Sequence, residues 1–420
     1  MKNDIKKFKT VRGMNDILPP SSSIWHDVEE TAYKIFSTYG YEEIRTPIVE
    51  NTDLFVRTVG ETTAIVEKEM YSFEDKGGDN LCLRPEGTAS IVRAYIESGM
   101  AMSEPVARYF YKGPMFRRER PQKGRQRQFH QIGIELLGID HPLADVEVIS
   151  SFNHLLNELK IKDVQLELNS IGCSQCRPKY NDDLVKYLQS HCKVLCEDCQ
   201  RRVSKNPMRA FDCKNEECGK YLKDAPKISN YWCAECVKHF EGVKKGLDCL
   251  EISYILNERI VRGLDYYVRT AFEFTTDKLG SQNAIAAGGR YDGLVKELGG
   301  PDLPGVGYAI GLERLMLLVD QMSNKRSEAF YFAVLGVDVA EKLIKVIADL
   351  RQNNFRIEWD FGLKSLKAQM RRADKLGVHT VIIVGEDELQ KGVATVRDMK
   401  TKGQREVRLK NLSGHLQALV

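Results

Sequence analysis

A strongly basic loop between two strand-like segments is the feature of this 420-residue chain that most constrains its fold. Residues 106–111 form an apolar, strand-like run, and Ile132, Ile134 and Leu136 alternate with other residues after the loop. Pro121 and Gly124 lie in the loop and are typical of turns. The pattern predicts a strand, a loop and a second strand. Its basic residues are Arg117, Arg118, Arg120, Lys123, Arg125 and Arg127.

Guanidinium groups bind phosphate oxygens in bidentate fashion, so this loop suits a polyphosphate or a nucleic-acid end. A solvated, charged hairpin is the alternative that the loop alone leaves open. The overall net charge of +3 is too small to indicate a nucleic-acid partner. RNA binding would therefore depend on local clusters such as this loop.

Length and composition indicate a water-soluble protein of two or three domains. A chain of 420 residues exceeds one ordinary core, and 42% hydrophobic with 29% charged residues is typical of globular proteins. Apolar runs long enough to cross a membrane are absent from the sequence. The segment Met1–Lys7 is charged and lacks the apolar core of a secretory signal, so we expect a cytoplasmic protein.

The middle of the chain differs in composition from the rest. From Cys173 to about Leu247 the sequence is polar and rich in lysine, and ten of the eleven cysteines lie between Cys173 and Cys249. Thiols stay reduced in the cytosol, so clustered cysteines there indicate metal ligands. Three Cys-x-x-Cys pairs begin at Cys173, Cys196 and Cys233.

Regular elements are predicted on both sides of this segment. Helical spacing predicts helices over residues 20–40, 88–97 and 143–159, and strands are expected at 41–48, 81–84 and 164–168. A polar linker is expected at Ser323–Ser327. Strands and helices then alternate, with Ser365 capping a basic helix that ends at Leu376, which describes a small α/β domain.

Seven strings resemble one known family, and they occur in family order. Phe116–Glu135 resembles motif 2 of the class II aminoacyl-tRNA synthetases, in the version of the histidyl-tRNA synthetases. Other strings resemble an N-terminal signature, class II motif 1, an amino-acid loop, two histidine-specific motifs and motif 3; they are Arg12–Pro19, Tyr41–Pro47, Leu83–Thr88, Arg262–Tyr267, Gly288–Asp292 and Gly305–Arg314.

The resemblance implies an α+β protein. Its catalytic domain would span residues 1–325 around an antiparallel sheet, interrupted by a cysteine-rich insertion at 170–250. A C-terminal α/β anticodon-binding domain would occupy residues 328–420. Walker A and dinucleotide-binding Gly-x-Gly-x-x-Gly strings do not accompany the glycines, which agrees with this assignment.

The activity implied is ligation of histidine to the 3′ end of tRNA(His), through histidyl-adenylate, with ATP as substrate and Mg²⁺ as cofactor. Class II motif 1 around Pro47 implies a homodimer. Two alternatives stay open: a regulatory paralogue that binds a phosphoribosyltransferase, and a tRNA-binding sensor without catalysis. The intact arginine set, Arg117, Arg262 and Arg314, argues against both.

Matching positions imply the roles of individual residues. Arg117 and Arg262 would act in catalysis and bind ATP at its α-phosphate, and Arg314 would bind the γ-phosphate. The histidine site would contain Glu86, Gly87, Thr88, Gln131, Glu135, Tyr266, Tyr267 and Tyr291. The tRNA acceptor end would meet Glu119, Arg120 and Gln122. His130 alternates with Gln131 on its strand and is expected to face away from substrate.

The insertion is predicted to bind zinc. The ligands expected are Cys173, Cys176, Cys196, Cys199, Cys213, Cys218, Cys233 and Cys236, enough for two Cys₄ sites. The spacing does not specify which pairs share an ion. Cys192 and Cys249 are not expected to be ligands. Free thiols in a variable segment are the alternative.

Overall fold

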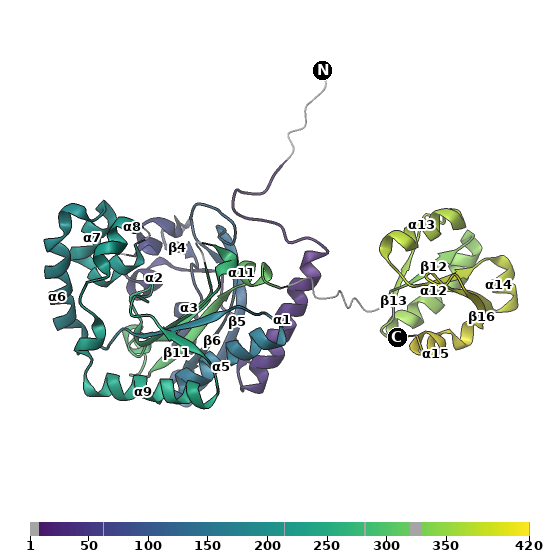
Figure 1. The fold of residues 1–420 in the computed structure, drawn as a ribbon. Helices are drawn as coiled ribbons and strands as arrows, with labels where there is room; N and C mark the ends of the chain where they lie inside the picture. The colour runs from purple at the N-terminus through teal and green to yellow at the C-terminus, as the bar shows by residue number, and fades with distance from the viewer. Residues whose placement is uncertain (1–7, 62, 214, 281–282, 320–328, 420) are drawn as a thin grey trace, which may run out of the picture. The chain divides into compact units, whose positions relative to one another are not determined.

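The chain forms two compact units, Met1–Asp320 and Gln321–Val420, each described by itself (Figure 1). The computed structural model describes residues 8–61, 63–213, 215–280, 283–319 and 329–419. The expected linker Ser323–Ser327 and the segment Met1–Lys7 lie outside the described residues. Among the described residues, no helix combines the length and apolar character needed to cross a membrane.

An eight-stranded sheet is the centre of the first unit. Its order is β1 (Glu42–Glu43), β5 (Ala107–Phe116), β6 (Gln128–Leu137), β11 (Gly305–Gly311), β10 (Ala284–Arg290), β9 (Val268–Thr275), β7 (Gln165–Ser170) and β8 (Tyr254–Leu256). Neighbours from β5 to β7 are antiparallel, and only the outer pairs β1–β5 and β7–β8 are parallel. The strand, basic loop and strand predicted from the sequence are β5, residues 117–127 and β6.

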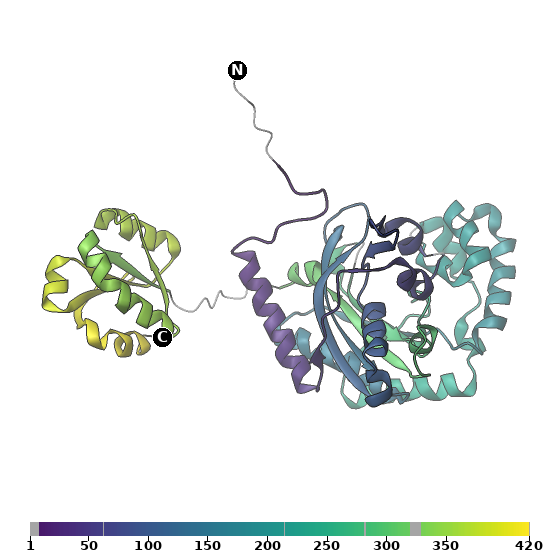
Figure 2. The same ribbon diagram turned by 180° about the vertical axis from the view of Figure 1, so that it is seen from behind.

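Three long helices cover one face of this sheet, here called the back face (Figure 2). They are α1 (Ser21–Thr38), α5 (Pro142–Glu158) and α9 (Ala234–Cys249). Phe36 of α1 and Phe152 of α5 are fully buried and pack with Phe110, Ile132 and Ile134 of the sheet. Residues at alternate positions on β5 and β6 therefore point to the opposite, front face.

Short elements lie at the front face. Strands β2 (Val49–Asn51), β4 (Asn80–Leu83) and β3 (Tyr71–Glu74) form a small antiparallel sheet. Helices α2 (Thr52–Val59), α3 (Thr88–Glu97), α4 (Met100–Ser103) and α10 (Leu294–Glu297) and a π-helix at Ile65–Glu69 accompany it. The short helix α11 (Leu312–Met316) follows β11 and packs Leu312 and Leu315 into the core of the back face. The single strand expected over 41–48 is wrong: β1 and β2 flank Pro47, which has no N–H for a sheet ladder.

The insertion lies between β7 and β8 and returns through α9. It contains α6 (Arg177–Ser190), α7 (Glu197–Lys205) and α8 (Glu216–Leu222), which gather at one side of the unit in Figure 1. Short 3₁₀ segments connect them at Cys192–Val194, Pro207–Asp212 and Ile228–Tyr231. Another such segment, Asp277–Leu279, follows β9. The helices bury Tyr180, Leu184 and Leu188, which belong to one apolar cluster with residues of α3 and of the large sheet, such as Val92 and Tyr109.

The second unit is a small α/β structure, as predicted. Its sheet has the order β13 (Arg356–Trp359), β12 (Ala329–Val334), β14 (Thr380–Val384), β15 (Val393–Asp398) and β16 (Gln404–Arg408). Its helices are α12 (Val337–Gln352), α13 (Leu366–Leu376), α14 (Glu386–Lys391) and α15 (Leu412–Gln417), with a 3₁₀ segment at Leu409–Asn411. Ser365 is the N-cap residue of α13, the basic helix expected from the sequence.

Candidate functional site

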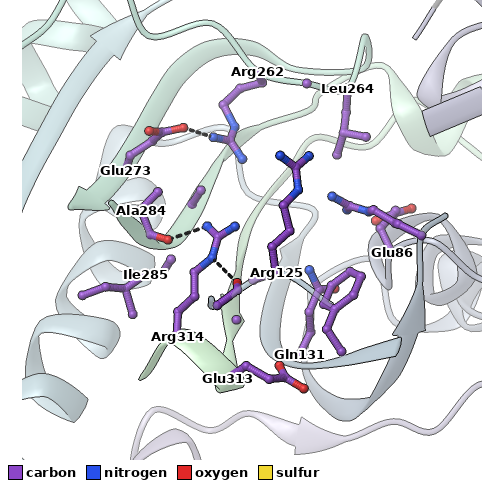
Figure 3. Close-up of a pocket in the computed structure, with 18 of the residues that line it drawn as sticks. Glu86, Arg125, Gln131, Arg262, Leu264, Glu273, Ala284, Ile285, Glu313 and Arg314 are labelled. Atoms are coloured by element: carbon purple, nitrogen blue, oxygen red, sulfur yellow. Dashed lines mark hydrogen bonds and ion pairs between the residues drawn. The ribbon is translucent and has the colours of Figure 1, made fainter. Parts of the chain in front are cut away.

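A cavity of about 500 Å³ opens on the front face of the large sheet. It is lined by β6, β9, β10, β11, the basic loop and the start of α3. In Figure 3 the guanidinium groups of Arg125, Arg262 and Arg314 gather in one half, and Glu86 and Gln131 lie in the other. The cavity therefore has a cationic half and an anionic half, which suits a ligand with opposite charges at its ends.

Small residues make the floor of the cavity. Ala286, Ala287, Ala309 and Gly311 on β10 and β11 all line it. The register pairs Ala309 with Gly133, and Gly307 with Glu135. A Cβ atom on Gly307 would collide with the Glu135 carboxylate, so this position requires glycine. The sheet thus has space on its front face for the polar side chains of β6 and for a bound molecule.

Glu86 is the acidic group of the anionic half. It is 3% exposed, and its two oxygens accept hydrogen bonds from the backbone N–H groups of Thr88 (2.7 Å) and Ala89 (2.9 Å) at the start of α3. Burial raises the pKa of the Glu86 carboxyl, and these two N–H groups oppose that rise. Gln131 lines the same half, and its buried Oε1 accepts no hydrogen bond from any described residue. Both groups suit an ammonium ligand.

A buried polar group lies behind the anionic half. Glu135 accepts hydrogen bonds from the Thr88 hydroxyl (2.6 Å) and from the Tyr291 hydroxyl, and its side chain is fully buried. The rings of Tyr266 and Tyr291 pack edge to face, with centroids 5.8 Å apart. Burial, together with the nearby Glu86 carboxylate, raises the pKa of the Glu135 carboxyl to about 8, against the effect of the two hydroxyl donors.

Backbone carbonyl groups orient two arginines of the cationic half. Arg117 donates from Nε to the carbonyl of Pro85 (2.9 Å) and lies over the ring of Phe129. Arg314 donates to the carbonyls of Gly124 (2.9 Å) and Ala284 (2.7 Å). Burial is the main cause that lowers the pKa of both guanidinium groups, which still keep their charge at neutral pH.

Arg262 also belongs to the cationic half, and its guanidinium lies beside an aromatic ring. Its guanidinium forms an ion pair with Glu273 on β9 and lies 5.3 Å from the ring centre of Tyr267. The Arg262 Nε atom is buried and has no hydrogen-bond partner among the described residues. A ligand oxygen is the natural acceptor for such an orphaned donor.

The basic loop divides into a buried and an exposed part. Glu119 is 8% exposed, forms an ion pair with Arg125, and lines the cavity together with it. Arg120 and Gln122 are exposed to solvent. Of the three residues expected at the tRNA acceptor end, Arg120 and Gln122 face solvent and Glu119 lines the cavity.

Most residues implied by the resemblance lie together. The cavity is lined by Glu86, Thr88, Arg117, Gln131, Tyr266, Tyr267, Arg262 and Arg314. Gly87, Glu135 and Tyr291 are buried beside it. His130 packs edge to face on Trp25, and its ring Nδ1 lies 3.0 Å from Glu313, so it faces away from the side chain of Gln131, as the alternation predicts.

The sequence assigns no individual role to four cavity residues. Arg125 and Glu313 lie inside the strings that resemble motif 2 and motif 3, and Glu273 is a single acidic residue without a pattern. Asp212 comes from the insertion, which no sequence pattern connects to the cavity. The family strings could have pointed to Arg125 and Glu313, whereas no pattern in the sequence points to Glu273 or Asp212.

The arginine of the second histidine-specific motif, Arg290, does not line the cavity. Arg290 is fully buried and forms an ion pair with the buried Asp145 of α5. His239 of α9 lies 3.5 Å from the same carboxylate. The Arg290 guanidinium is the main attraction that holds the pKa of Asp145 well below its usual range, against the effect of burial. This network joins β10 to α5 and α9 on the back face.

Two groups of cysteines in the insertion could hold metal ions. One contains Cys173, Cys176, Cys233 and Cys236, and the other contains Cys196, Cys199, Cys213 and Cys218. Together these are the eight cysteines expected from the sequence. The four thiols of each group lie within 4.8 Å of one another.

Comparison with known proteins agrees with this geometry. A model of the histidyl-tRNA synthetase family matches residues 13–315, and a model of the anticodon-binding domain matches residues 328–419. The chain belongs to the histidyl-tRNA synthetase family. It has the class II synthetase catalytic fold followed by an anticodon-binding domain, as the sequence predicted.

Several relatives match this chain over nearly their whole length. Proteins named histidine–tRNA ligase from Syntrophotalea carbinolica and Halothermothrix orenii are each 49% identical to this chain, covering 96% of both chains in the first case and 98% and 99% in the second. The apo histidyl-tRNA synthetase of S. aureus is 34% identical, with a TM-score of 0.82 over 97% of this chain and 99% of that one. These matches do not favour the regulatory paralogue.

The raised pKa of Glu135 predicts a pH-dependent stability. The folded protein keeps this proton up to about pH 8, whereas the unfolded chain releases it near the ordinary value of 4.5. Glu135 therefore contributes stability below about pH 4.5 that is lost as the pH rises to about 8. In Glu135→Gln the amide replaces the protonated carboxyl and does not titrate.

In calorimetry without ligands, we expect the unfolding midpoint temperature of Glu135→Gln minus that of the unmodified protein to increase from pH 5 to pH 9. Glu158→Gln is the control, because Glu158 is exposed on α5. A difference between Glu135→Gln and the unmodified protein that does not change with pH would contradict the prediction.

Proposed function

We propose that this chain is a histidine–tRNA ligase that activates L-histidine with ATP and transfers it to the 3′ end of tRNA(His). One observation carries the proposal: a single cavity joins a carboxylate half at Glu86 to a cationic half with four arginines. Histidine has an ammonium group, and ATP has a polyphosphate, so the two substrates fit opposite halves. Membership of the family supplies the reaction class.

The first step is displacement at phosphorus. An oxygen of the histidine carboxylate bonds to the α-phosphorus of ATP, the bond from that phosphorus to the bridging oxygen breaks, and pyrophosphate leaves. Charge is redistributed over phosphate oxygens, so positioned guanidinium groups lower the barrier. We assign Arg117 and Arg262 to the α-phosphate and Arg314 to the γ-phosphate.

Mg²⁺ would enter with ATP and neutralise phosphate charge when bound. The carboxylates of Glu273 and Glu313 line the cationic half, and carboxylate oxygens are ligands of the kind that Mg²⁺ prefers. The residues present therefore fit this cofactor.

Histidine recognition needs partners for the ammonium group and for both imidazole nitrogens. We assign the ammonium to Glu86, Thr88 and the unpaired Oε1 of Gln131, and the imidazole to Glu135 and Tyr267. Gln131 and Glu135 project from the same face of β6, because they are four residues apart on one strand. An apolar amino acid would leave the Glu135 carboxyl group without a partner from the ligand, which favours histidine.

Transfer follows at the same site. A ribose hydroxyl oxygen of the terminal adenosine bonds to the histidyl carbonyl carbon, the mixed-anhydride bond from that carbon to the phosphate oxygen breaks, and AMP leaves while the hydroxyl proton is released. We assign the exposed loop residues Arg120 and Gln122 to the acceptor end of the tRNA. The second unit is assigned to the anticodon, where α13 and the residue before its N-cap offer exposed basic side chains, namely Lys367, Arg371, Arg372 and Lys375 on the helix and Lys364 before it.

We propose a cytoplasmic homodimer as the working form. The eleven cysteines all lie among the described residues and none is in a disulfide, which agrees with a reducing compartment. Ile48 and Val49 follow Pro47 of motif 1 and are 41% and 42% exposed. Val49 begins β2, an edge strand of the small sheet. An exposed apolar edge strand is a surface that a second copy can cover.

Arg262→Ala should reduce histidine-dependent ATP–pyrophosphate exchange about a hundredfold or more, which corresponds to roughly 3 kcal/mol lost at the transition state. Arg259→Ala is the matched control, because Arg259 is exposed three positions away and does not line the cavity. Near-normal exchange by Arg262→Ala would remove Arg262 from the catalytic set. Absence of exchange in the unmodified protein, with histidine and with other amino acids, would refute the proposed function.

Arg120→Ala should lower tRNA charging much more than pyrophosphate exchange, because Arg120 is exposed on the loop and does not line the cavity. The two assays on one preparation separate the transfer step from the activation step, and Arg259→Ala again serves as control. An equal loss in both assays would assign Arg120 to ATP instead.

Val49→Asp should convert a dimer to monomers at micromolar concentration in analytical ultracentrifugation. A buried carboxylate at an apolar contact is costly when it has no partner. Leu250→Asp is the control, because Leu250 is also exposed (52%) but lies at the end of α9. A fully active monomer of the unmodified protein would exclude the dimer.

A further inference from the structure

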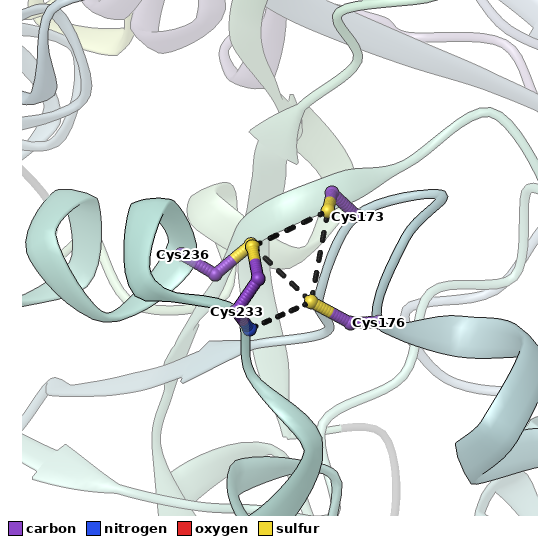
Figure 4. A group of neighbouring side chains, drawn as sticks. All are labelled: Cys173, Cys176, Cys233 and Cys236. Carbon is purple, nitrogen blue, oxygen red and sulfur yellow. Dashed lines mark hydrogen bonds between the residues drawn. The ribbon is translucent and has the colours of Figure 1, made fainter.

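The eight clustered cysteines form two separate groups, and the structure specifies which pairs come together. Cys173 and Cys176 meet Cys233 and Cys236 in the first cluster, shown in Figure 4. Cys196 and Cys199 meet Cys213 and Cys218 in the second cluster. The second cluster is nested inside the chain segment that the first cluster closes.

Distances between sulfur atoms fit a tetrahedral ion. In the first cluster they are 3.6 Å for Cys173–Cys176, 3.8 Å for Cys173–Cys233 and 3.6 Å for Cys176–Cys236. The Cys196–Cys213 distance in the second cluster is 3.7 Å. Four sulfur atoms at about 2.3 Å from Zn²⁺ form a tetrahedron with edges of about 3.8 Å. A disulfide would need sulfur atoms about 2.05 Å apart.

The backbone around the clusters supports thiolates. Cys176, Cys196 and Cys233 are the N-cap residues of α6, α7 and α9, so three sulfur ligands lie at the positive ends of helices. Backbone N–H groups point at sulfur: that of Cys233 at Cys176 Sγ (3.2 Å), and that of Cys196 at Cys218 Sγ (3.2 Å). Both features lower the cost of negative charge on the ligands.

We infer that the insertion binds two Zn²⁺ ions, one in each Cys₄ cluster, and that the ion of the first cluster positions the histidine pocket through Arg177. Soft thiolates in a tetrahedral arrangement select zinc over the hard cations that bind oxygen. The positioning role rests on the proposed function, whereas the metal assignment does not.

Arg177 connects the first cluster to the pocket. It follows Cys176 directly and donates hydrogen bonds to the carbonyls of Ile171 (3.2 Å) and Tyr267. The Tyr267 ring lines the cavity beside Arg262. The strand that leads into the cluster is held as well, because Gly172 accepts a hydrogen bond from the backbone N–H of Arg269 (2.8 Å). An ion that fixes Cys176 therefore fixes the start of α6 and, through Arg177, the backbone of Tyr267.

The second cluster has a different place in the unit. Cys213 follows the 3₁₀ segment Pro207–Asp212 directly. Asn206, just before this segment, donates to Asp265 (2.8 Å), and Arg209 within it forms an ion pair with the same carboxylate (3.2 Å). Asp265 belongs to the first histidine-specific motif. The second ion would hold the segment that presents Asp212 to the cavity.

Packed thiols without metal are the competing interpretation. Cys199 and Cys218 are fully buried beside Leu195 and Val203, and cysteine is a common small core residue. Such a core would tolerate serine or alanine at single positions and would bind no metal. It would also leave no reason for four sulfur atoms to converge twice.

Metal content of full-length protein purified without chelator is the first test. We expect two zinc ions per chain, one in Cys173→Ser/Cys233→Ser and one in Cys196→Ser/Cys213→Ser. Cys192→Ser and Cys249→Ser are matched controls from the same segment that should keep both ions. Zinc that is absent from the unmodified protein, or lost in either control, would overturn the assignment.

Thiol titration of the unmodified protein tests the sites even where a variant fails to fold. The eight cluster thiols, like the fully buried Cys82, should resist a thiol reagent in the native protein. The eight should react after zinc is removed, and Co²⁺ should restore their protection with the visible absorption of a tetrahedral thiolate site. If all cluster thiols react in the native protein, the clusters do not bind zinc and the cysteines are free thiols.

Pyrophosphate exchange tests the positioning role. Arg177→Met should keep two zinc ions and raise the KM for histidine about tenfold with a smaller change in kcat. Lys179→Met, an exposed position on the same helix, should change neither constant. An unchanged KM in Arg177→Met would refute the positioning role while leaving the zinc assignment intact. Exchange that is absent in the unmodified protein would instead remove the proposed function, because the zinc count does not depend on it.

Discussion

The cavity depends on the near absence of side chains over one patch of the large sheet. On the front face, β10 and β11 present glycine and alanine where a sheet usually carries larger residues. Glu135 occupies the volume that a side chain at Gly307 would need, and Tyr111 does the same at Gly133. Large polar groups from β5 and β6 can therefore lie flat against their neighbours. A single methyl group at either glycine would displace a side chain that lies in or beside the proposed histidine site.

The choice of hydrogen-bond partner preserves the charge of Arg117 in the cationic half. Its guanidinium is oriented by the carbonyl group of Pro85, which does not cancel the charge. A carboxylate partner would orient it equally well, but would reduce the attraction for a polyphosphate. Arg262 and Arg125 differ, since Glu273 pairs with the first and Glu119 with the second. An ATP phosphate that approaches Arg262 must compete with that carboxylate, whereas Arg117 is preorganised for the anion.

Local sequence patterns predict much of this fold and site, and long-range packing accounts for the rest. Helix α3 and the alternation of β6 follow from residue spacing, and the family motifs assign Glu86 and Gln131 to one site. Glu135 shows the limit, because its neighbours Thr88 and Tyr291 are distant in the chain and its burial depends on a glycine of β11. Asp212 shows it more strongly, since an inserted segment delivers it to the cavity. Cysteine spacing predicts the candidate ligands, but only the fold brings the first and third Cys-x-x-Cys pairs together.

The nesting of the two cysteine clusters has a consequence for the order in which the chain assembles. Strands β7 and β9 pair directly, yet the whole insertion separates them. Cys173 and Cys233 are 60 residues apart, so closing that loop costs roughly 3–4 kcal/mol of chain entropy before any strand contact compensates for it. With an ion bound at the first cluster, that loop is closed before β9 emerges to meet β7. The Zn²⁺ ion proposed for this cluster would shorten the effective separation of two central strands, so zinc supply during synthesis would affect how readily the large sheet is completed.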